Sequence, residues 1–358
     1  MSSSADIAVV GAGPVALSLA ALLVGRGRKC VVGNRSPERL GPIRQRGGVE
    51  VDGDLDPGFV PLPELTTDLG QAVRDASLVL YALPAFAHLD AFLTTLPHLG
   101  AGTRVVFLSG SGASLEAACR ARESGRGYDD LAFGETATPP LSARMTGPAS
   151  VRVKLHATTR FGAFPGINTE RIADELAQLF AVTVTPTALD PAVNNPNFLI
   201  HPAPMLLNYA EVERSRGELS LINEGMTEGV LRVLDAVDAE KMALQQALGL
   251  EVLPIDRFYE LAGTGAGVYR SPGENFGAGY RDRIWDRYID EDVPYGTVLY
   301  ASLGRLAGVP TPVSDGINRL LSVVKQTDFE QRGRSLAALG LAGLDRAAVP
   351  AYLRTGDR

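Results

Sequence analysis

Gly11, Gly13 and Ala16 form the pattern G-x-G-x-x-A directly after a short apolar run. In this pattern the first glycine allows a tight turn, and the second lets backbone N–H groups approach a pyrophosphate. The alanine keeps the following helix close to the preceding strand. Pro14 suits the first helical turn, because its fixed φ is already helical. We therefore expect Gly11, Gly13, Pro14 and Ala16 to bind a dinucleotide.

A second polar group, Asn34, Arg35 and Ser36, follows the next apolar run. NAD-binding units place Asp or Glu here to bind the ribose hydroxyls, and this carboxylate would repel a 2′-phosphate. In this chain an amide, a guanidinium and a hydroxyl take its place, and the latter two are phosphate donors. These residues predict a preference for NADPH over NADH. The alternative is that Arg35 is only a solvated loop residue.

The third candidate group combines His201 with the carboxylates Asp290, Glu291 and Asp292. Pro202 follows His201, which predicts a helix start there, because a residue before proline avoids the α region. Acidic residues just before a helix also serve as caps, so local sequence leaves the role of the three carboxylates open. The other three histidines have no polar cluster around them in the sequence.

These groups need elements that position them, and the first half of the chain alternates strands and helices. Strands are expected at 7–10, 29–33, 48–52, 77–83, 103–109, 131–134, 150–156 and 182–186, with helices at 14–24, 69–75, 85–96 and 114–123. This pattern predicts an α/β Rossmann domain with a doubly wound, mostly parallel sheet. A change of pattern near 190 predicts two domains, a dinucleotide-binding domain (1–190) and an all-α domain (191–358).

Further helices are expected in the second domain at 208–214, 227–248, 252–261, 280–288, 295–307 and 312–325. The formal net charge of −7 argues against a nucleic-acid or anionic-membrane partner. Two cysteines, Cys30 and Cys119, make neither a disulfide framework nor a metal cluster, and both are interpreted as small buried hydrophobes. The amino terminus lacks the basic region of a signal peptide, and no segment is predicted to span a membrane. A cytoplasmic protein without a metal is therefore expected.

Several blocks of the chain resemble the opine dehydrogenases, and they occur in the family's order along nearly the whole sequence. The blocks are residues 195–208 (NPNFLIHPAPMLLN), 223–227 (NEGMT), 237–241 (VDAEK), 291–296 (EDVPYG) and 308–312 (GVPTP), with weaker likeness at 134–136 (GET) and 327–336. The resemblance implies reduction of the imine formed from an amino acid, or another amine, and a 2-keto acid by NAD(P)H. It also implies a His–Asp pair for acid–base chemistry.

Carried onto this sequence, the resemblance assigns the histidine to His201 and the aspartate most plausibly to Asp292. A carboxylate a few ångströms away favours the imidazolium more than a helix N-terminus disfavours it, so His201 is expected to exchange protons near neutral pH. The substrate carboxylates need cationic or amide partners, for which Asn197 and Arg144 are the candidates. The family's NAD users carry an acid after the second strand, and this chain departs from them there.

Two other functions fit the same scaffold. One is an NADPH-dependent 2-keto acid reductase resembling ketopantoate reductase, which would use a lysine of the second domain. Lys241 is the candidate, although an i,i+3 ion pair with Asp238 on a long amphipathic helix explains it better. The other is a non-catalytic NADPH sensor. A homodimer is expected because two-fold assembly is common among soluble proteins.

Overall fold

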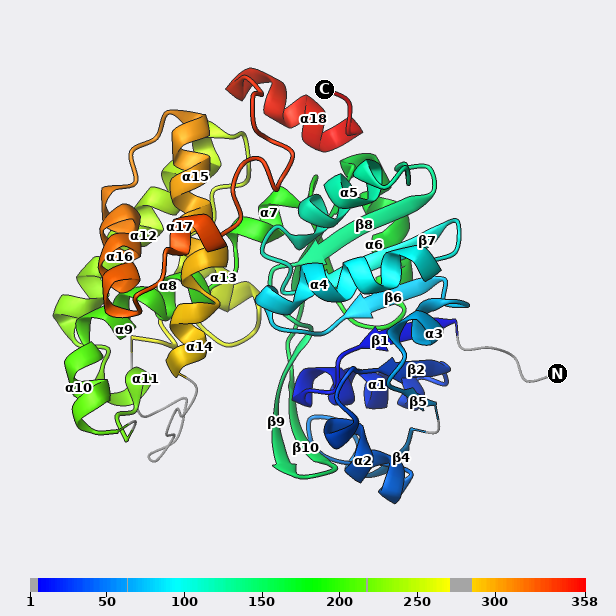
Figure 1. Ribbon diagram of the computed structural model, residues 1–358. Helices are drawn as coiled ribbons and strands as arrows, with labels where there is room; N and C mark the ends of the chain where they lie inside the picture. Colours follow the sequence, from blue (N-terminus) through cyan, green and yellow to red (C-terminus); the bar gives the residue numbers. More distant parts are fainter. Residues whose placement is uncertain (1–5, 63, 217, 271–284) are drawn as a thin grey trace. The chain divides into compact units, whose positions relative to one another are not determined.

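The computed structural model describes residues 6–62, 64–216, 218–270 and 285–358 (Figure 1). The chain divides into two compact units, which are described here one at a time. Unit 1 comprises Met1–Ala192 with Ala351–Asp357, and unit 2 comprises Val193–Pro350 with Arg358. The predicted division at 190 lies beside this boundary, but the last helix of the chain belongs to unit 1 and not to the second domain.

Unit 1 is built on an eight-stranded sheet with the order β12-β11-β8-β7-β6-β1-β2-β5. The six strands from β8 to β5 are mutually parallel, and β11 joins them antiparallel to β8. Short apolar runs such as 7–10 are buried on both faces, as expected for parallel strands covered by helices. The strands are β1 (Ile7–Val10), β2 (Cys30–Gly33), β5 (Leu65–Thr66), β6 (Leu78–Tyr81), β7 (Thr103–Leu108), β8 (Leu131–Thr136), β11 (Thr159–Phe164) and β12 (Val182–Val184).

The fold class predicted from the sequence is confirmed, but the sequence analysis did not separate two of the predicted strands from the main sheet. The predicted strands near 48–52 and 150–156 form a separate four-stranded sheet with the order β4-β3-β10-β9. Its strands alternate buried and exposed residues, so only one of its faces packs on the core. The sequence analysis missed β4, β5, β9 and β11. The strands of this sheet are β3 (Gly48–Gly53), β4 (Gly58–Pro61), β9 (Leu141–Gly147) and β10 (Ser150–Leu155).

Helix α1 (Pro14–Gly25) lies between the two sheets and contacts strands of both. Eight of its twelve residues are buried, which explains why its sequence is apolar all round and has no polar face. Its side chains share one core cluster with inward residues of β1, β3 and β10. The glycine-rich turn before α1 is therefore held by a helix that is packed on two sides.

The other helices of unit 1 cover the main sheet. Figure 1 shows α4 and α5 in front of strands β6 to β8, where Tyr81, Phe92, Phe107 and Phe133 form an aromatic cluster. These helices are α2 (Pro37–Arg46), α3 (Leu69–Val73), α4 (Ala85–Thr95), α5 (Ala113–Glu123), α6 (Thr169–Ala177), α7 (Leu189–Val193) and α18 (Val349–Thr355). Helix α18 joins this unit because Tyr352 packs on Phe164.

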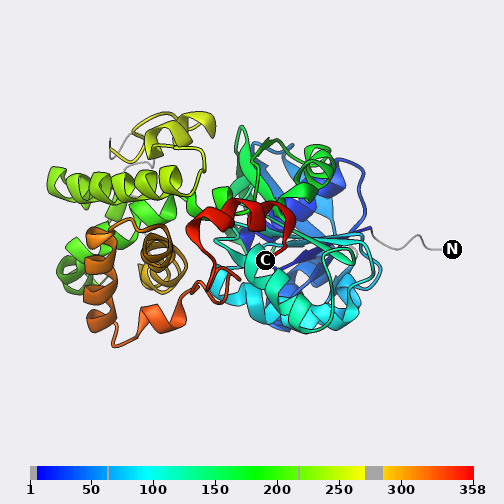
Figure 2. The ribbon, with the colours of Figure 1, turned by 90° about the horizontal axis from the view of Figure 1, so that it is seen from above.

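Unit 2 is entirely helical in its described part, as the sequence predicted. Its centre is the 20-residue α12, seen along its side in Figure 2, which packs against α9, α15 and α16. The helices are α8 (Asn197–Ile200), α9 (Pro202–Leu207), α10 (Tyr209–Arg214), α11 (Leu221–Glu224), α12 (Glu228–Ala247), α13 (Ile255–Leu261), α14 (Trp285–Asp290), α15 (Val298–Ala307), α16 (Pro312–Val324) and α17 (Phe329–Arg332). A π-helical turn, η3 (Val293–Thr297), comes before α15. Of the helix predicted over 280–288, residues 280–284 lie outside the described residues.

None of the helices in the described ranges is long and apolar enough to cross a bilayer. The two cysteines differ in exposure. Cys30 is buried on β2, and burial together with the charge of Glu64 raises the pKa of its thiol to about 12. Cys119 on α5 is only half-buried, so the expectation that both are buried is wrong for this residue.

We predict that a thiol reagent at about pH 8 modifies Cys119 in the native protein and leaves Cys30 intact. Because the folded state raises the pKa of Cys30 above its unfolded value, the unreactive thiol form persists until the pH approaches that raised pKa. Counting modified thiols by mass spectrometry before and after unfolding checks this. A C119S variant that still reacts in the native state would contradict it.

Candidate active site

The glycine-rich turn joins β1 to α1. Gly11 has φ +129, and a Cβ there would lie 2.5 Å from the carbonyl oxygen of Ala82, so only glycine fits. Gly13 is the N-cap of α1 without a side-chain cap, and a Cβ built on it would meet nothing within 4 Å. The N-cap position is therefore uncrowded on its Cβ side, and it begins a helix whose first N–H groups can stabilise a pyrophosphate. These residues fit a nicotinamide dinucleotide.

The polar group after β2 lies at the start of α2. Arg35 is exposed and forms an ion pair with Asp90 of α4. The Ser36 hydroxyl donates to Glu38 at 2.6 Å, and this hydrogen bond lowers the pKa of Glu38. The Asn34 side chain donates to the backbone oxygen of Ser36 at 3.2 Å. Both donors predicted for a 2′-phosphate, the Arg35 guanidinium and the Ser36 hydroxyl, thus contact carboxylates.

A carboxylate that the sequence analysis did not single out shapes the loop after β7. Glu135 on β8 is fully buried, and its two oxygens accept hydrogen bonds from the N–H groups of Gly112 and Ser114, both at 2.8 Å. Ser109 and Ser111 in this loop have positive φ, a conformation that side chains rarely adopt. Glu135 therefore holds a strained loop and the N-terminus of α5 at the carboxyl edge of the sheet. This gives the glutamate of the 134–136 block (GET) a structural role.

In unit 2, His201 lies at the junction of α8 and α9. It ends α8 and serves as the N-cap of α9, so the predicted helix start at Pro202 is present. Its φ and ψ are −110 and −61, within the α region, whereas the following proline led us to expect an extended conformation. The reason is that His201 is also the C-cap of α8. Its N–H donates to the Asn197 carbonyl at 3.0 Å, so the helical hydrogen-bond pattern continues to His201.

Asp292 comes directly before the π-helical turn η3. The N–H of Thr297 donates to the Asp292 carbonyl at 3.3 Å, which is the i to i+5 bond of a π-turn. A Cβ at Gly296 would lie 2.3 Å from the ring of Phe198 on α8. This glycine therefore lets η3 approach α8 closely, and α8 ends at His201. The EDVPYG block is the segment that brings the carboxylate to the imidazole.

His201 Nδ1 donates a hydrogen bond to Asp292 Oδ2 at 2.7 Å. Both side chains are buried, 9% and 6% exposed, so the pair is little screened by solvent. Burial raises the pKa of the Asp292 carboxyl, while the hydrogen bond and charge of His201 act in the opposite direction. The structure thus brings together the expected couple, and no hydrogen bond from His201 Nε2 occurs among the described residues.

The three consecutive carboxylates have three different partners, which decides between the alternatives that the sequence left open. Asp290 lies 3.6 Å from Lys325 Nζ, and Glu291 forms an ion pair with Arg287 of α14. Only Asp292 contacts His201. Burial acts to lower the pKa of Arg287, but Glu291 and Asp292 more than offset it, so the guanidinium stays charged. The sequence analysis did not name Arg287, although its i,i+4 spacing to Glu291 was visible.

The two predicted substrate residues differ in their positions. Asn197 begins α8, one turn before His201, and is half-buried. Arg144 is exposed on β9 in the four-stranded sheet. Its location adds no support for a role in substrate binding. Across the described residues, no three His, Cys, Asp or Glu side chains are grouped as a metal site.

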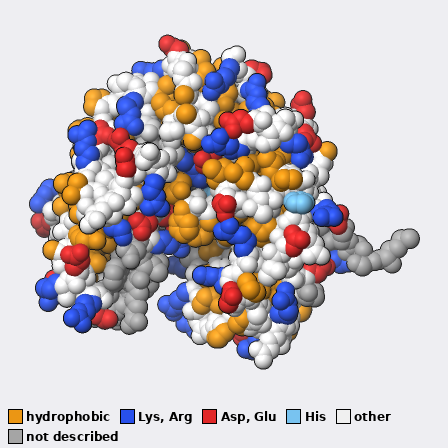
Figure 3. Space-filling model, in the orientation of Figure 1, with side chains coloured by type: hydrophobic (Ala, Val, Ile, Leu, Met, Phe, Trp, Pro, Cys, Tyr) orange, Lys and Arg blue, Asp and Glu red, His pale blue; other side chains and the backbone are white. Residues whose placement is uncertain are grey.

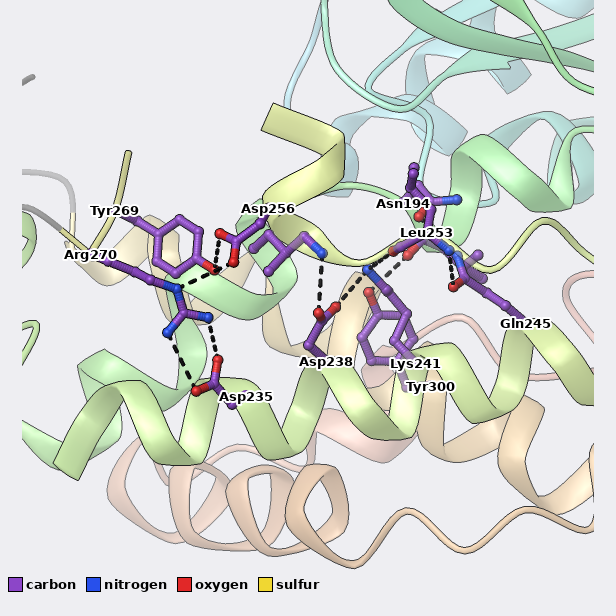
Figure 4. A network of polar contacts seen from close by, with 12 residues as sticks. Asn194, Asp235, Asp238, Lys241, Gln245, Leu253, Asp256, Tyr269, Arg270 and Tyr300 are labelled. Carbon is purple, nitrogen blue, oxygen red and sulfur yellow. Dashed lines mark hydrogen bonds and ion pairs between the residues drawn. The ribbon is translucent and has the colours of Figure 1, made fainter. Parts of the chain in front are cut away.

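Lys241, the alternative catalytic lysine, is held in a buried polar network (Figure 4). Its Nζ lies 2.7 Å from Asp238 Oδ1 and donates to the Leu253 carbonyl at 2.7 Å. Asp238 also accepts the N–H of Ile255 at 3.1 Å. Only 3% of the Lys241 side chain is exposed, so this ammonium stabilises the connection of α12 to α13. The ion-pair interpretation is the one that the geometry supports.

Comparison with known proteins identifies both parts of the chain. Residues 184–325 match the family model described as NAD/NADP octopine/nopaline dehydrogenase, alpha-helical domain. Residues 6–108 match the model described as NADP oxidoreductase coenzyme F420-dependent. The two matches follow the order of a nucleotide-binding sheet and a helical domain.

Whole-chain relatives agree. The opine dehydrogenase of Arthrobacter sp. (strain 1C) is 31% identical over 362 residues, covering 98% of this chain and 99% of that protein. An octopine dehydrogenase solved with NADH and L-arginine aligns with a TM-score of 0.68 at 16% identity, covering 99% of both chains. A yersinopine dehydrogenase with NADP+ bound aligns with a TM-score of 0.70 at 15% identity, also covering 99% of both.

The chain belongs to the opine dehydrogenase family. It is an oxidoreductase that uses a nicotinamide cofactor and acts on CH–NH bonds, through the reductive condensation of an amine with a 2-keto acid. The resemblance stated from the sequence is thereby confirmed.

For Lys241 we predict a structural effect. The K241M variant leaves the buried Asp238 carboxylate without its cation, which costs about 3–5 kcal/mol of unfolding free energy. The paired K241M/D238L variant recovers part of that loss, because no uncompensated charge remains. Chemical denaturation measures both. A K241M protein with unchanged stability but turnover reduced about a hundred-fold would instead indicate the lysine of a keto acid reductase.

Proposed function

We propose that this enzyme is an NADPH-preferring opine dehydrogenase in which His201 and Asp292 form the catalytic acid–base couple. The observation that carries the proposal is the buried hydrogen bond between His201 Nδ1 and Asp292. A carboxylate on Nδ1 keeps the proton there in the neutral ring, so that Nε2 is the edge that exchanges protons. The bound nicotinamide cofactor supplies the hydride that reduces the imine carbon.

The couple moves protons from the amine nitrogen to the keto oxygen in two rounds. When the amine nitrogen adds to the keto carbon, His201 Nε2 takes one proton from the nitrogen and gives it to the alkoxide oxygen, which forms the carbinolamine. In the second round His201 Nε2 carries the remaining N–H proton to the hydroxyl oxygen, which leaves as water, and the imine forms. Asp292 stays ionised and stabilises the imidazolium in each round, because its charge lies 2.7 Å from Nδ1. Both steps need a group that changes protonation near neutral pH.

Substrate carboxylates need charged or polar donors close to the couple. Arg287 is half-exposed, remains charged, and lies on the segment that carries Asp292. Its planar fork suits bidentate binding of a carboxylate. Asn197 lies one turn before His201 on α8. We propose Arg287 as the main partner of the substrate carboxylates and Asn197 as a secondary donor. Arg144 stays a minor candidate for the same role.

The preference for NADPH rests on the group Asn34, Arg35 and Ser36. The position after β2 carries no acidic residue that would repel a 2′-phosphate. The Arg35 guanidinium and the Ser36 hydroxyl can donate hydrogen bonds to it instead. Asp90 and Glu38 compete for these donors. An exposed ion pair of this kind contributes about 0–1 kcal/mol, so a phosphate group with nearly two charges displaces it easily. A homodimer and a cytoplasmic location stay predictions.

Charge on the visible surface agrees with small-molecule partners. Acidic and basic side chains are interspersed over the face shown in Figure 3. Together with the net charge of −7, this surface offers little to a nucleic-acid backbone.

The first test follows NADPH oxidation with a 2-keto acid alone and with amino acids or other amines added. We expect oxidation only when both are present, and a product whose mass equals that of the N-(1-carboxyalkyl) amine. The H201Q variant should lower kcat/KM by about 10²–10⁴-fold, as expected for a lost acid–base group. Oxidation with the keto acid alone would favour a keto acid reductase, and tight NADPH binding without any turnover would favour a sensor.

The second test addresses the cofactor. The R35A variant removes a charge-assisted contact to the 2′-phosphate, so kcat/KM for NADPH should fall about 10–100-fold while that for NADH stays nearly constant. Arg28 is the matched control. It lies just before β2, whereas Arg35 lies just after it, and R28A also removes one positive charge. Equal losses with both cofactors in R35A, or equal effects of R35A and R28A on NADPH, would contradict the preference.

A further inference from the structure

The ring of Tyr288 lies face to face on the imidazole of His201. The two ring centroids are 3.6 Å apart and the planes are inclined by only 17°. Both residues are buried, with 8% of Tyr288 and 7% of His201 exposed. The imidazole is thus held on one face by an aromatic ring and at Nδ1 by a carboxylate.

Both contacts come from one short segment. Tyr288 is in α14, and Asp292 follows it by four residues, just before η3. Residues four apart lie on the same side of a helical segment. One element therefore presents the aromatic face and the carboxylate together, and α14 packs directly on α9, which begins after His201.

The geometry is unusual for two neutral rings. Uncharged aromatic pairs avoid full face-to-face overlap, because their negative faces repel, and they prefer offset or edge-on arrangements. A centroid separation as short as 3.6 Å with nearly parallel planes leaves little room for an offset. A cation over a ring face is attracted instead, so this arrangement is the one that a charged imidazole favours.

Other charges around the couple are largely balanced by partners. On α14 and the turn after it, Arg287 pairs with Glu291, and Asp290 lies near Lys325. Helices α8 and α9 carry no acidic or basic side chain. On the other elements that pack against α9, Glu211 pairs with Arg214 on α10, Asp238 pairs with Lys241 on α12, and Glu240 accepts hydrogen bonds at the start of α16.

We propose that Tyr288 is a positioning residue for the acid–base couple, whose ring face selectively stabilises the imidazolium form of His201. This inference rests on the proposed catalytic role of His201. The phenol face fixes the plane of the imidazole, so the proton on Nε2 leaves in one direction. It also adds to the electrostatic effect of Asp292 on the same ring.

The test uses three variants and a readout that does not depend on turnover. Y288F keeps the ring face, Y288L removes it while keeping an apolar side chain, and Y259L removes a tyrosine ring of α13 elsewhere in unit 2 as the matched control. NMR follows the titration of the His201 ring, whose signal is identified by its absence in H201Q. The chain has four histidines, so the spectra are simple.

We expect the His201 titration midpoint in Y288L to move to lower pH by about half a unit to one and a half units, because the charged form loses a desolvated cation–π contact. Y288F and Y259L should titrate like the unchanged protein. The limb of the pH–rate profile assigned to the couple should shift with the NMR midpoint. Coincident midpoints for Y288L and the unchanged protein would overturn the proposal, as would an equal shift in Y288F.

A second series guards against poor folding of Y288L. Phenylalanine analogues with one, two and three ring fluorines at position 288 keep the ring shape and progressively weaken the negative face. The midpoint should fall with each added fluorine, and a constant midpoint would overturn the proposal. If the midpoints shift as expected but H201Q retains full turnover, the stack is real and the proposed catalytic role of His201 is wrong.

Discussion

The proposed active site depends on the hydrogen bond between the His201 imidazole and the buried Asp292 carboxylate. Neither group would be stable alone in this place, because an unpaired charge in an apolar environment is costly. Burial raises the pKa of Asp292, and the hydrogen bond and charge of His201 oppose that effect. The close approach of Gly296 to Phe198 and the π-turn after Asp292 serve to bring these two side chains together.

Both units also contain a buried carboxylate that accepts hydrogen bonds from the first N–H groups of a helix. Glu135 does this for α5, and Glu240 accepts the N–H groups of Val313 and Ser314 at the start of α16. Both contacts join elements far apart in the sequence. They hold helices rigidly without a ligand, whereas the N-terminus of α1 has no side-chain cap and is suited to a phosphate.

The local sequence was sufficient to predict an element where a residue type has a single structural role. The glycines before α1 predicted the turn, and His201 with Pro202 predicted the start of α9. Sequence could not assign 48–52 and 150–156 to a second sheet. These strands form a separate sheet because their inward residues pack on α1, and this contact is made only in three dimensions. It also could not choose among Asp290, Glu291 and Asp292, since the choice is made by Lys325, Arg287 and His201 in three dimensions. Tyr288 had no signal beyond its spacing to Asp292.

A double-mutant cycle on the couple tests the central claim most directly, using the amine and keto acid pair that supports the fastest NADPH oxidation. If His201 and Asp292 act as one unit, kcat of H201Q/D292N equals that of H201Q within about three-fold, because members of a catalytic unit show strongly non-additive losses. Multiplicative losses, with the double variant slower by the product of the two single effects, would show that the residues act independently and would contradict this account.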